Sequence, residues 1–287
     1  MATTSRRCIT VRLSAPRPRW RSGPQAEPQK LSSRTKGHPT VTDRPLAEKI
    51  ALVTGATRGI GAATAVALAK AGAHVVCVGR SEGGLQEVDD NIRAVGGSAT
   101  LVPLNLKDSD GIDRLGGALY ERYGRLDIYV ANAGVLGPLS PLGHVFPKDW
   151  EDTVAVNLTA NWRCVRSFDP LLKLSPAGRA VVVTSGAASK ARAYWGPYAI
   201  TKAGLEVMAR TWADESVSGN LKVNLFNPGP IRTLMRAKAF PGEDPSSLPA
   251  PEDAAEAILP LCLPTFMESS KLYDFPQKKL LSFQMPA

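Results

Sequence analysis

The sequence predicts an α/β fold, a single domain built on a doubly wound parallel sheet. Two observations support this prediction. Short apolar segments alternate with helical patterns, and a glycine-rich turn separates the first apolar segment from the first helical pattern. No internal repeat or second domain is evident. Strands are expected over residues 50–54, 74–79, 99–105, 126–131, 180–185 and 222–227, with helices in most intervals forming right-handed βαβ crossovers.

The first expected strand leads into a glycine-rich turn and an alanine-rich helix that ends near Ala71. Gly55 permits the tight turn, Gly59 lets the backbone approach a pyrophosphate, and Gly61 lets the helix pack closely on the strand. The N-terminus of the helix then faces the phosphates, where its N–H groups favour negative charge. This strand, turn and helix together predict a dinucleotide site.

A second pattern predicts a proton-transfer site. If residues 197–215 form a helix, the four-residue step places Tyr198 and Lys202 on one face, where the ammonium would lower the phenol pKa from about 10. Ser185 ends the apolar segment 179–185, at the carboxyl end of a strand, where open α/β folds bind ligands. The alternative is a chance pairing of Tyr and Lys on an amphipathic helix.

At these residues the chain resembles the short-chain dehydrogenase/reductase family, whose domain has a Rossmann-type fold. Five motifs match in order, and the resemblance covers about residues 46–265. The matches are residues 54–61 for the glycine motif, Asn132, Ala133 and Gly134 for Asn-Ala-Gly, Asn157 for the asparagine of the fourth helix, Ser185, Tyr198 and Lys202 for the catalytic set, and residues 228–233 for Pro-Gly-x-x-x-Thr.

The resemblance implies reversible hydride transfer between a nicotinamide cofactor and a carbonyl compound or secondary alcohol. Tyr198 would donate the proton, Ser185 would hold the carbonyl oxygen, Lys202 would lower the tyrosine pKa and bind the nicotinamide ribose, and Asn157 would support a water. Expected cofactor-binding residues are Gly55, Thr57, Arg58, Gly59, Ile60, Gly61, Arg80, Asn105, Leu106, Asn132, Ala133, Gly134, Tyr198, Lys202, Pro228, Gly229, Ile231 and Thr233. The alternative function is a dinucleotide-binding sensor or regulator without turnover.

Charge favours NADP(H) over NAD(H). An NAD enzyme carries an acidic residue after its second strand to bind the ribose 2′-hydroxyl, but Gly79 and Arg80 stand here. Together with Arg58 in the glycine turn, Arg80 could clamp a 2′-phosphate. The alternative is that both arginines are solvated surface charges. Asn105 stands where the family usually has an aspartate near the adenine, so that contact is expected to be neutral.

The positive charge of the chain is concentrated at its start. Residues 1–40 carry nine Lys or Arg and one acidic residue, whereas the other 247 residues carry 26 basic and 25 acidic ones. We expect residues 1–40 to be a disordered basic tail, either an over-extended gene start or a dispensable segment, and residues 41–287 to be the catalytic domain. A transit peptide, or an arm that contacts RNA or anionic lipid, is the alternative.

The remaining composition indicates a protein of a reducing compartment, expected in the cytoplasm, with no nucleic-acid or membrane partner. No apolar run approaches the length of a membrane span, and the three histidines form no metal-binding cluster. No metal is expected. The cysteines lack the spacing of a disulfide framework or a zinc site; they are Cys8, Cys77, Cys164 and Cys262.

Substrate and assembly are predicted less specifically. Residues 186–197 and 234–249 are the expected pocket walls, and Tyr194, Trp195, Met235 and Phe240 suggest a moderately apolar carbonyl substrate.

The resemblance implies a homodimer through one long helix over residues 150–174 and a second over 197–215. Trp162 and Trp212 could anchor the dimer or be buried in one subunit. Residues 271–283 replace the family's usual Gly-Gly ending, which puts its tetramer in doubt.

Overall fold

The computed structural model describes residues 44–283, so the prediction of a disordered tail over residues 1–40 lies outside it. The strands are β1 (Ile50–Thr54), β2 (His74–Gly79), β3 (Ser98–Pro103), β4 (Ile128–Ala131), β5 (Arg179–Val183), β6 (Lys222–Asn227), β7 (Lys271–Asp274) and β8 (Lys279–Ser282). The α-helices are α1 (Gly59–Lys70), α2 (Glu82–Ala94), α3 (Ser109–Tyr123), α4 (Pro147–Val154), α5 (Ala160–Lys173), α6 (Ala187–Lys190), α7 (Gly196–Glu215), α8 (Leu234–Ala239) and α9 (Pro251–Cys262). Short 3-10 helices cover Leu142–His144 and Pro245–Ser247.

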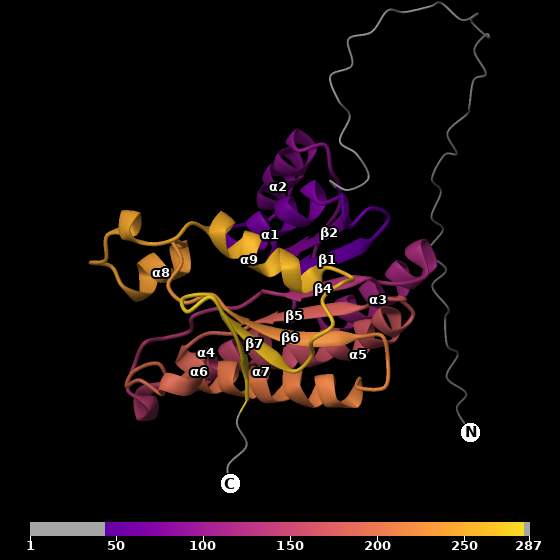
Figure 1. Ribbon diagram of the computed structural model, residues 1–287. Helices are drawn as coiled ribbons and strands as arrows, with labels where there is room; N and C mark the ends of the chain where they lie inside the picture. Colours follow the sequence, from indigo (N-terminus) through magenta and orange to yellow (C-terminus); the bar gives the residue numbers. More distant parts are fainter. Residues whose placement is uncertain (1–43, 284–287) are drawn as a thin grey trace, which may run out of the picture. The chain divides into compact units, whose positions relative to one another are not determined.

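The strands form one eight-stranded sheet in the order β3-β2-β1-β4-β5-β6-β7-β8. All neighbouring pairs are parallel except β7 and β8, which are antiparallel. The chain moves outward from β1 to β3 and then returns to start β4 beside β1, which creates a switch point between these two strands. The predicted α/β, doubly wound, Rossmann-type fold is therefore confirmed (Figure 1).

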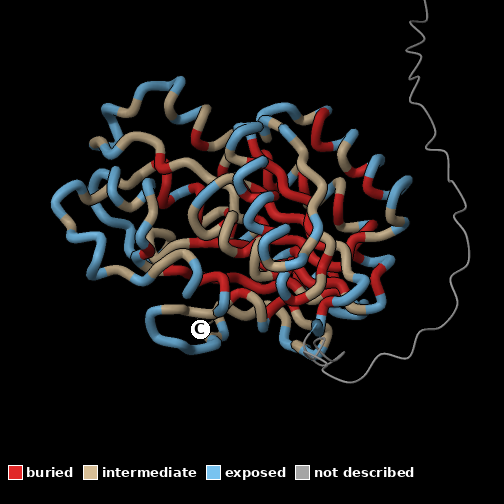
Figure 2. Tube along the Cα trace, turned by 90° about the horizontal axis from the view of Figure 1, so that it is seen from above, coloured by how far each residue is buried: buried red, intermediate tan, exposed pale blue. Residues whose placement is uncertain are grey.

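Helices cover both faces of the sheet and bury it. On one face, residues of α1, α2 and α9 pack against the strands, and on the other α3, α5 and α7 do so (Figure 1). Every residue of β5 is buried, because helices lie on both sides of it. Figure 2 shows buried residues through the interior of the domain and exposed residues around its periphery. No helix among residues 44–283 is long and apolar enough to cross a bilayer.

All six predicted strands are present, with ends that differ by at most two residues from those expected. The sequence analysis did not predict β7 and β8. Each has four residues, all of them only partly buried or exposed, so neither has the long apolar pattern of a central strand. Their place depends on tertiary pairing. In particular, the Tyr273 ring stacks parallel to that of Phe226 on β6, with centroids 5.9 Å apart.

The helix predicted over residues 150–174 is not regular. A π-helical turn, Ala155–Thr159, separates α4 from α5, although the backbone stays helical throughout. Such a turn adds one residue to the hydrogen-bonded ring and changes the direction of the side chains that follow. Asn157 lies in the middle of this turn.

Candidate active site

A cleft of about 700 Å³ lies at the carboxyl ends of β1 to β6. It is lined by all the predicted cofactor residues except Gly61, and also by Ser185. Asn157 does not line it. Parallel strands bring their carboxyl ends to one edge of a sheet, so segments far apart in the sequence meet here.

The glycine turn has the close contacts that its spacing predicts. Gly55 and Gly59 have φ angles of +66° and +56°, a conformation that favours glycine. A Cβ atom on Gly61 would lie 2.3 Å from the Gly55 carbonyl oxygen, so only glycine fits. At the N-terminus of α1, Arg58 is extended and provides no side-chain cap. The first N–H groups of α1 can therefore bind a phosphate.

Thr54 connects this turn to the loop after β4. Its Oγ1 atom accepts hydrogen bonds from the backbone N–H groups of Asn132, at 3.1 Å, and Ala133, at 3.2 Å. In return, Asn132 Nδ2 donates to the carbonyl oxygens of Thr54 and Gly55, at 3.0 and 3.3 Å. These four bonds fix the two walls of the cleft at the switch point.

Arg58 and Arg80 both line the cleft, and neither forms an ion pair with a carboxylate of residues 44–283. Gly79 has a steric role that the sequence analysis missed, because it considered only the lack of an acidic side chain there. A Cβ atom at position 79 would lie 2.3 Å from Thr57 Cγ2. Glycine at the end of β2 therefore lets Thr57, in the phosphate turn, pack against the strand.

Tyr198 and Lys202 lie in α7, and both are almost fully buried. Lys202 Nζ lies 5.8 Å from the centroid of the Tyr198 ring and donates a 2.8 Å hydrogen bond to the Val183 carbonyl oxygen. Burial lowers the pKa of Lys202 from 10.5 to about 8, and the Glu206 carboxylate acts in the opposite direction. The spacing therefore places the two side chains as predicted, on one side of the helix.

The predicted cause of a lowered tyrosine pKa needs correction. Burial raises the pKa of Tyr198, and the group that opposes this rise is the Ser185 hydroxyl, through a hydrogen bond, rather than Lys202. Sequence spacing shows the charged neighbour but not the depth at which the phenol is buried. Ser185 Oγ accepts a 3.2 Å hydrogen bond from Ala187 N, which leaves the hydroxyl proton available to a ligand or to Tyr198.

Asn157 is completely buried behind the cleft. Its Oδ1 atom accepts from Val135 N at 2.8 Å, and its Nδ2 atom donates to Val135 O at 2.9 Å and to Thr201 Oγ1 at 3.1 Å. Its own carbonyl oxygen accepts from Asn161 Nδ2 at 2.8 Å. The side chain thus joins the loop after β4 to α7, and a role in supporting a water stays a prediction.

The expected pocket walls are present only in part. Trp195 and Met235 line the cleft, whereas Tyr194 is 59% exposed and lies outside its lining. Phe240 does not line the cleft but contacts Trp195, with ring centroids 5.7 Å apart, and Trp195 contacts Tyr198 at 6.0 Å. The predicted wall 234–249 also contributes Leu234, Arg236, Ala237, Ala239 and Pro245 to the lining. Further lining residues that the sequence analysis missed are Val78, Ser81, Leu104, Val135, Leu136, Val156, Val183, Thr184, Arg232 and Pro251.

Arg236 braces the wall that carries α8. Its guanidinium forms a two-point ion pair with Glu243, with both N–O distances at 2.5 Å, and lies 3.7 Å above the Phe240 ring. A planar guanidinium suits both contacts at once. Contacts within this segment therefore stabilise the wall, and Phe240 connects it to Tyr198 through Trp195.

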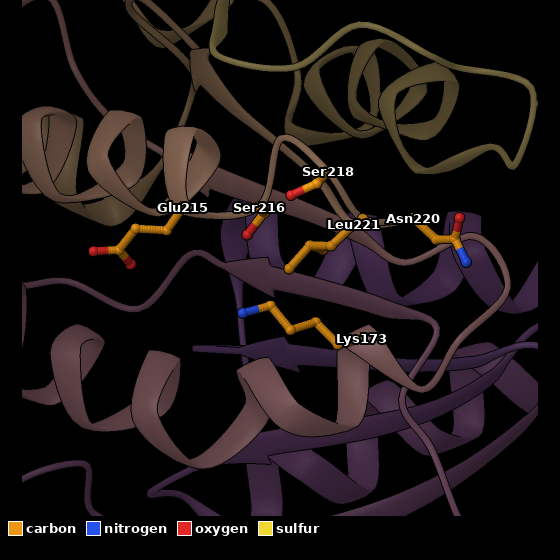
Figure 3. Close-up of a pocket in the computed structure, with 7 residues that line it drawn as sticks. Lys173, Glu215, Ser216, Ser218, Asn220 and Leu221 are labelled. Atoms are coloured by element: carbon orange, nitrogen blue, oxygen red, sulfur yellow. The ribbon is translucent and has the colours of Figure 1, made fainter.

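A smaller surface pocket of about 390 Å³ lies near the end of α7 (Figure 3). Its lining includes Lys173 from α5, Glu215 from α7 and Ser218 from the loop before β6. Lys173 already pairs with Asp169 at 2.8 Å. This pocket lies at the amino end of β6, away from the edge where Ser185 and Tyr198 meet.

Comparisons with known proteins agree with this geometry. The model of the short chain dehydrogenase family matches residues 49–244. The uncharacterized oxidoreductase YciK of Escherichia coli K12 is 38% identical over 221 residues, which cover 76% of this chain and 86% of that protein. A solved structure of a short chain dehydrogenase from Salmonella enterica serovar Typhi has a TM-score of 0.78 and 34% identity, covering 83% of this chain and 99% of that one. A solved structure of a short chain dehydrogenase from Shigella flexneri 2a, complexed with NADP, has a TM-score of 0.78 and 35% identity, covering 82% of this chain and 99% of that one.

Proposed function

The chain belongs to the short-chain dehydrogenase family and is an oxidoreductase, and we propose that it interconverts a carbonyl compound and a secondary alcohol with NADP(H). One observation carries the proposal. Ser185, Tyr198 and Lys202 lie in the same cleft as the glycine turn, so a proton donor and a dinucleotide site face one volume.

In the proposed reaction, four side chains of the site donate the proton, bind the substrate or cofactor, or hold the loops in place. The cofactor, when bound, supplies or accepts the hydride. Tyr198 donates its phenolic proton to the oxygen that becomes the alcohol, and Ser185 holds that oxygen by a hydrogen bond. Lys202 binds the nicotinamide ribose, and its hydrogen bond to the Val183 carbonyl oxygen holds α7 against β5. Asn157 holds the loop after β4 against α7.

NADP(H) is the proposed cofactor because of Arg58 and Arg80. Both guanidinium groups line the cleft without an ion-pair partner among residues 44–283, so they can bind a phosphate without first losing another contact. The similar protein from Shigella flexneri 2a has been solved with NADP, which supports the same choice here.

The substrate is proposed to be a moderately apolar carbonyl compound. Leu136, Trp195, Leu234 and Met235 provide apolar surface in the cleft that also contains Tyr198. A pocket with an apolar lining and few polar groups selects for shape and apolar area rather than charge.

We also propose a homodimer through α5 and α7, in the cytoplasm. Trp162, Ile200 and Val207 are between 45% and 53% exposed, and together they provide apolar surface on these two helices. Trp212 has a different role, because it is buried in its own subunit and donates a 2.7 Å hydrogen bond to Asp169. Of the two tryptophans, Trp162 is therefore the one available to an interface.

The experiment that tests the proposed activity is a screen of the purified full chain. Ketones and aldehydes are offered with NADPH, and secondary alcohols with NADP+, while the absorbance of the reduced cofactor is followed. We expect turnover of at least one carbonyl and alcohol pair. Binding of NADPH without turnover of any compound would instead support the alternative function, a non-catalytic sensor. The complete set of proton-transfer residues argues against that alternative.

A further inference from the structure

Asn227, the last residue of β6, holds two loops of the active site with one side-chain oxygen. Its Oδ1 atom accepts a 2.9 Å hydrogen bond from Gly186 N and a 3.2 Å bond from Gly229 N. Gly186 directly follows Ser185, and Gly229 lines the cleft in the loop after β6. Asn227 is only 8% exposed, so these bonds are protected from water. One amide thus fixes the distance between the Ser185 turn and the opposite wall.

Asp274, the last residue of β7, determines the orientation of that amide. The two residues are register partners on neighbouring strands, and Asp274 Oδ2 accepts a 3.2 Å hydrogen bond from Asn227 Nδ2. An ionised carboxylate can only accept hydrogen bonds. It therefore selects the Nδ2 end of the amide and leaves the oxygen for Gly186 and Gly229. A backbone bond of 3.0 Å, from Phe275 N to Asn227 O, holds the two strands together at this point.

The turn between β7 and β8 packs directly on the same loop. Gly229 has a φ of +63°, and a Cβ atom there would lie 2.3 Å from Pro276 Cγ. Asp274 also accepts a 3.2 Å hydrogen bond from Gln277 N, which shapes the turn. The segment that carries Asp274 is thus a tight hairpin against the cleft wall, and its position depends on glycine at residue 229.

We propose that Asn227 and Asp274 are positioning residues for the reaction. They act through Gly186 on the Ser185 hydroxyl and through Gly229 on the cofactor side of the cleft. The C-terminal hairpin therefore contributes to catalysis without touching the reacting atoms. This inference rests on the proposed function, since it assigns the pair to the same site.

Matched variants separate positioning from stability. Asn227→Ala removes both acceptor bonds. Asn224→Ala is the control, because Asn224 lies on the same strand and its side chain bonds only the C-terminal segment: Nδ2 donates to Glu268 O at 2.8 Å, and Oδ1 accepts from Lys271 N at 3.1 Å. Asp274→Leu removes the acceptor but keeps the number and branching of the side-chain heavy atoms, whereas Asp274→Asn keeps an acceptor oxygen and should rescue function.

The measurements are kcat and KM, the Kd for NADPH, and the melting temperature. We expect Asn227→Ala to lower kcat/KM by roughly 10- to 100-fold, the range in which small misplacements act, and Asn224→Ala to lower only the melting temperature. Asp274→Leu should lose about 10-fold and Asp274→Asn less than about twofold. The double variant Ser185→Ala/Asn227→Ala should lose less than the product of the two single losses, because one residue acts through the other.

The inference is overturned if Asn227→Ala and Asn224→Ala lose kcat/KM equally, or if the losses of Ser185→Ala and Asn227→Ala simply multiply. A wild type that binds NADPH but turns over no substrate refutes the proposed activity alone. In that case the Kd decides the inference. Weaker NADPH binding by Asn227→Ala than by Asn224→Ala supports it, and equal binding overturns it. A wild type that does not bind NADPH overturns both.

Discussion

Lys202 Nζ donates a 2.8 Å hydrogen bond to the carbonyl oxygen of Val183, the last residue of β5. This contact ties α7 to the strand that ends two residues before Ser185. It explains how Ser185 and Tyr198, thirteen positions apart in the chain, come to face one cleft. The buried ammonium therefore connects α7 to β5 at the site, in addition to its proposed role in binding the cofactor.

Arg58 and Arg80 should account for the cofactor preference. If each charge-assisted contact to a 2′-phosphate contributes about 1 to 2 kcal/mol, the double variant Arg58→Ala/Arg80→Ala should lose roughly 30- to 1000-fold in NADP(H) affinity. NAD(H) affinity should be nearly unchanged, because NAD lacks that phosphate. Titration of both cofactors measures this. The control Arg93→Ala/Arg114→Ala removes two exposed arginines that pair with Asp89 and Asp108. A double variant that still prefers NADP(H) would contradict the charge argument.

Gly79 should be needed for both cofactors. In Gly79→Ala the new methyl group would lie 2.3 Å from Thr57 Cγ2, so the Thr57 side chain in the glycine turn must shift. Affinity for NADP(H) and NAD(H) should then fall together, whatever the charge at this position. Gly83→Ala in α2 is the matched control, since nothing lies within 4 Å of its Cβ position. Equal cofactor affinities of Gly79→Ala and the wild type would refute the steric role.

Burial of Lys202 should make the free energy of unfolding depend on pH. Its pKa is about 8 in the folded protein and near 10.5 when exposed, so between these values the unfolded state binds more protons. The free energy of unfolding of the wild type should therefore rise, relative to Lys202→Met, as the pH increases from about 8 to 10.5. The total gain is on the order of 3 kcal/mol. Denaturant unfolding at several pH values measures it. A constant or falling difference would show that the ammonium is not buried as described.

Local spacing was enough to predict the parts of the site that lie within one element. The glycine turn at residues 55–61 and the pairing of Tyr198 with Lys202 follow from the steps of a turn and a helix. Contacts made between elements could not be predicted. The packing of Pro276 on Gly229 and the pairing of β7 with β6 depend on where distant segments meet.

The burial of individual side chains and local irregularities of the helices could not be predicted from the sequence either. The direction of the Tyr198 pKa shift is set by burial, and burial is a property of the folded core rather than of neighbouring residues. The π turn at Asn157 is similar, because its residues have the pattern of an ordinary helix. Its side-chain bonds to Val135 and Thr201 appear only when three segments are packed together.

The most direct test of the proposed chemistry is NADPH oxidation by Tyr198→Phe in the presence of a carbonyl substrate. The substitution removes only the phenolic oxygen and its proton, so turnover should fall at least about 100-fold while the Kd for NADPH stays within about twofold. Tyr194→Phe, which changes an exposed tyrosine outside the cleft lining, should keep wild-type activity. Wild-type turnover by Tyr198→Phe would contradict the assignment of Tyr198 as the proton donor.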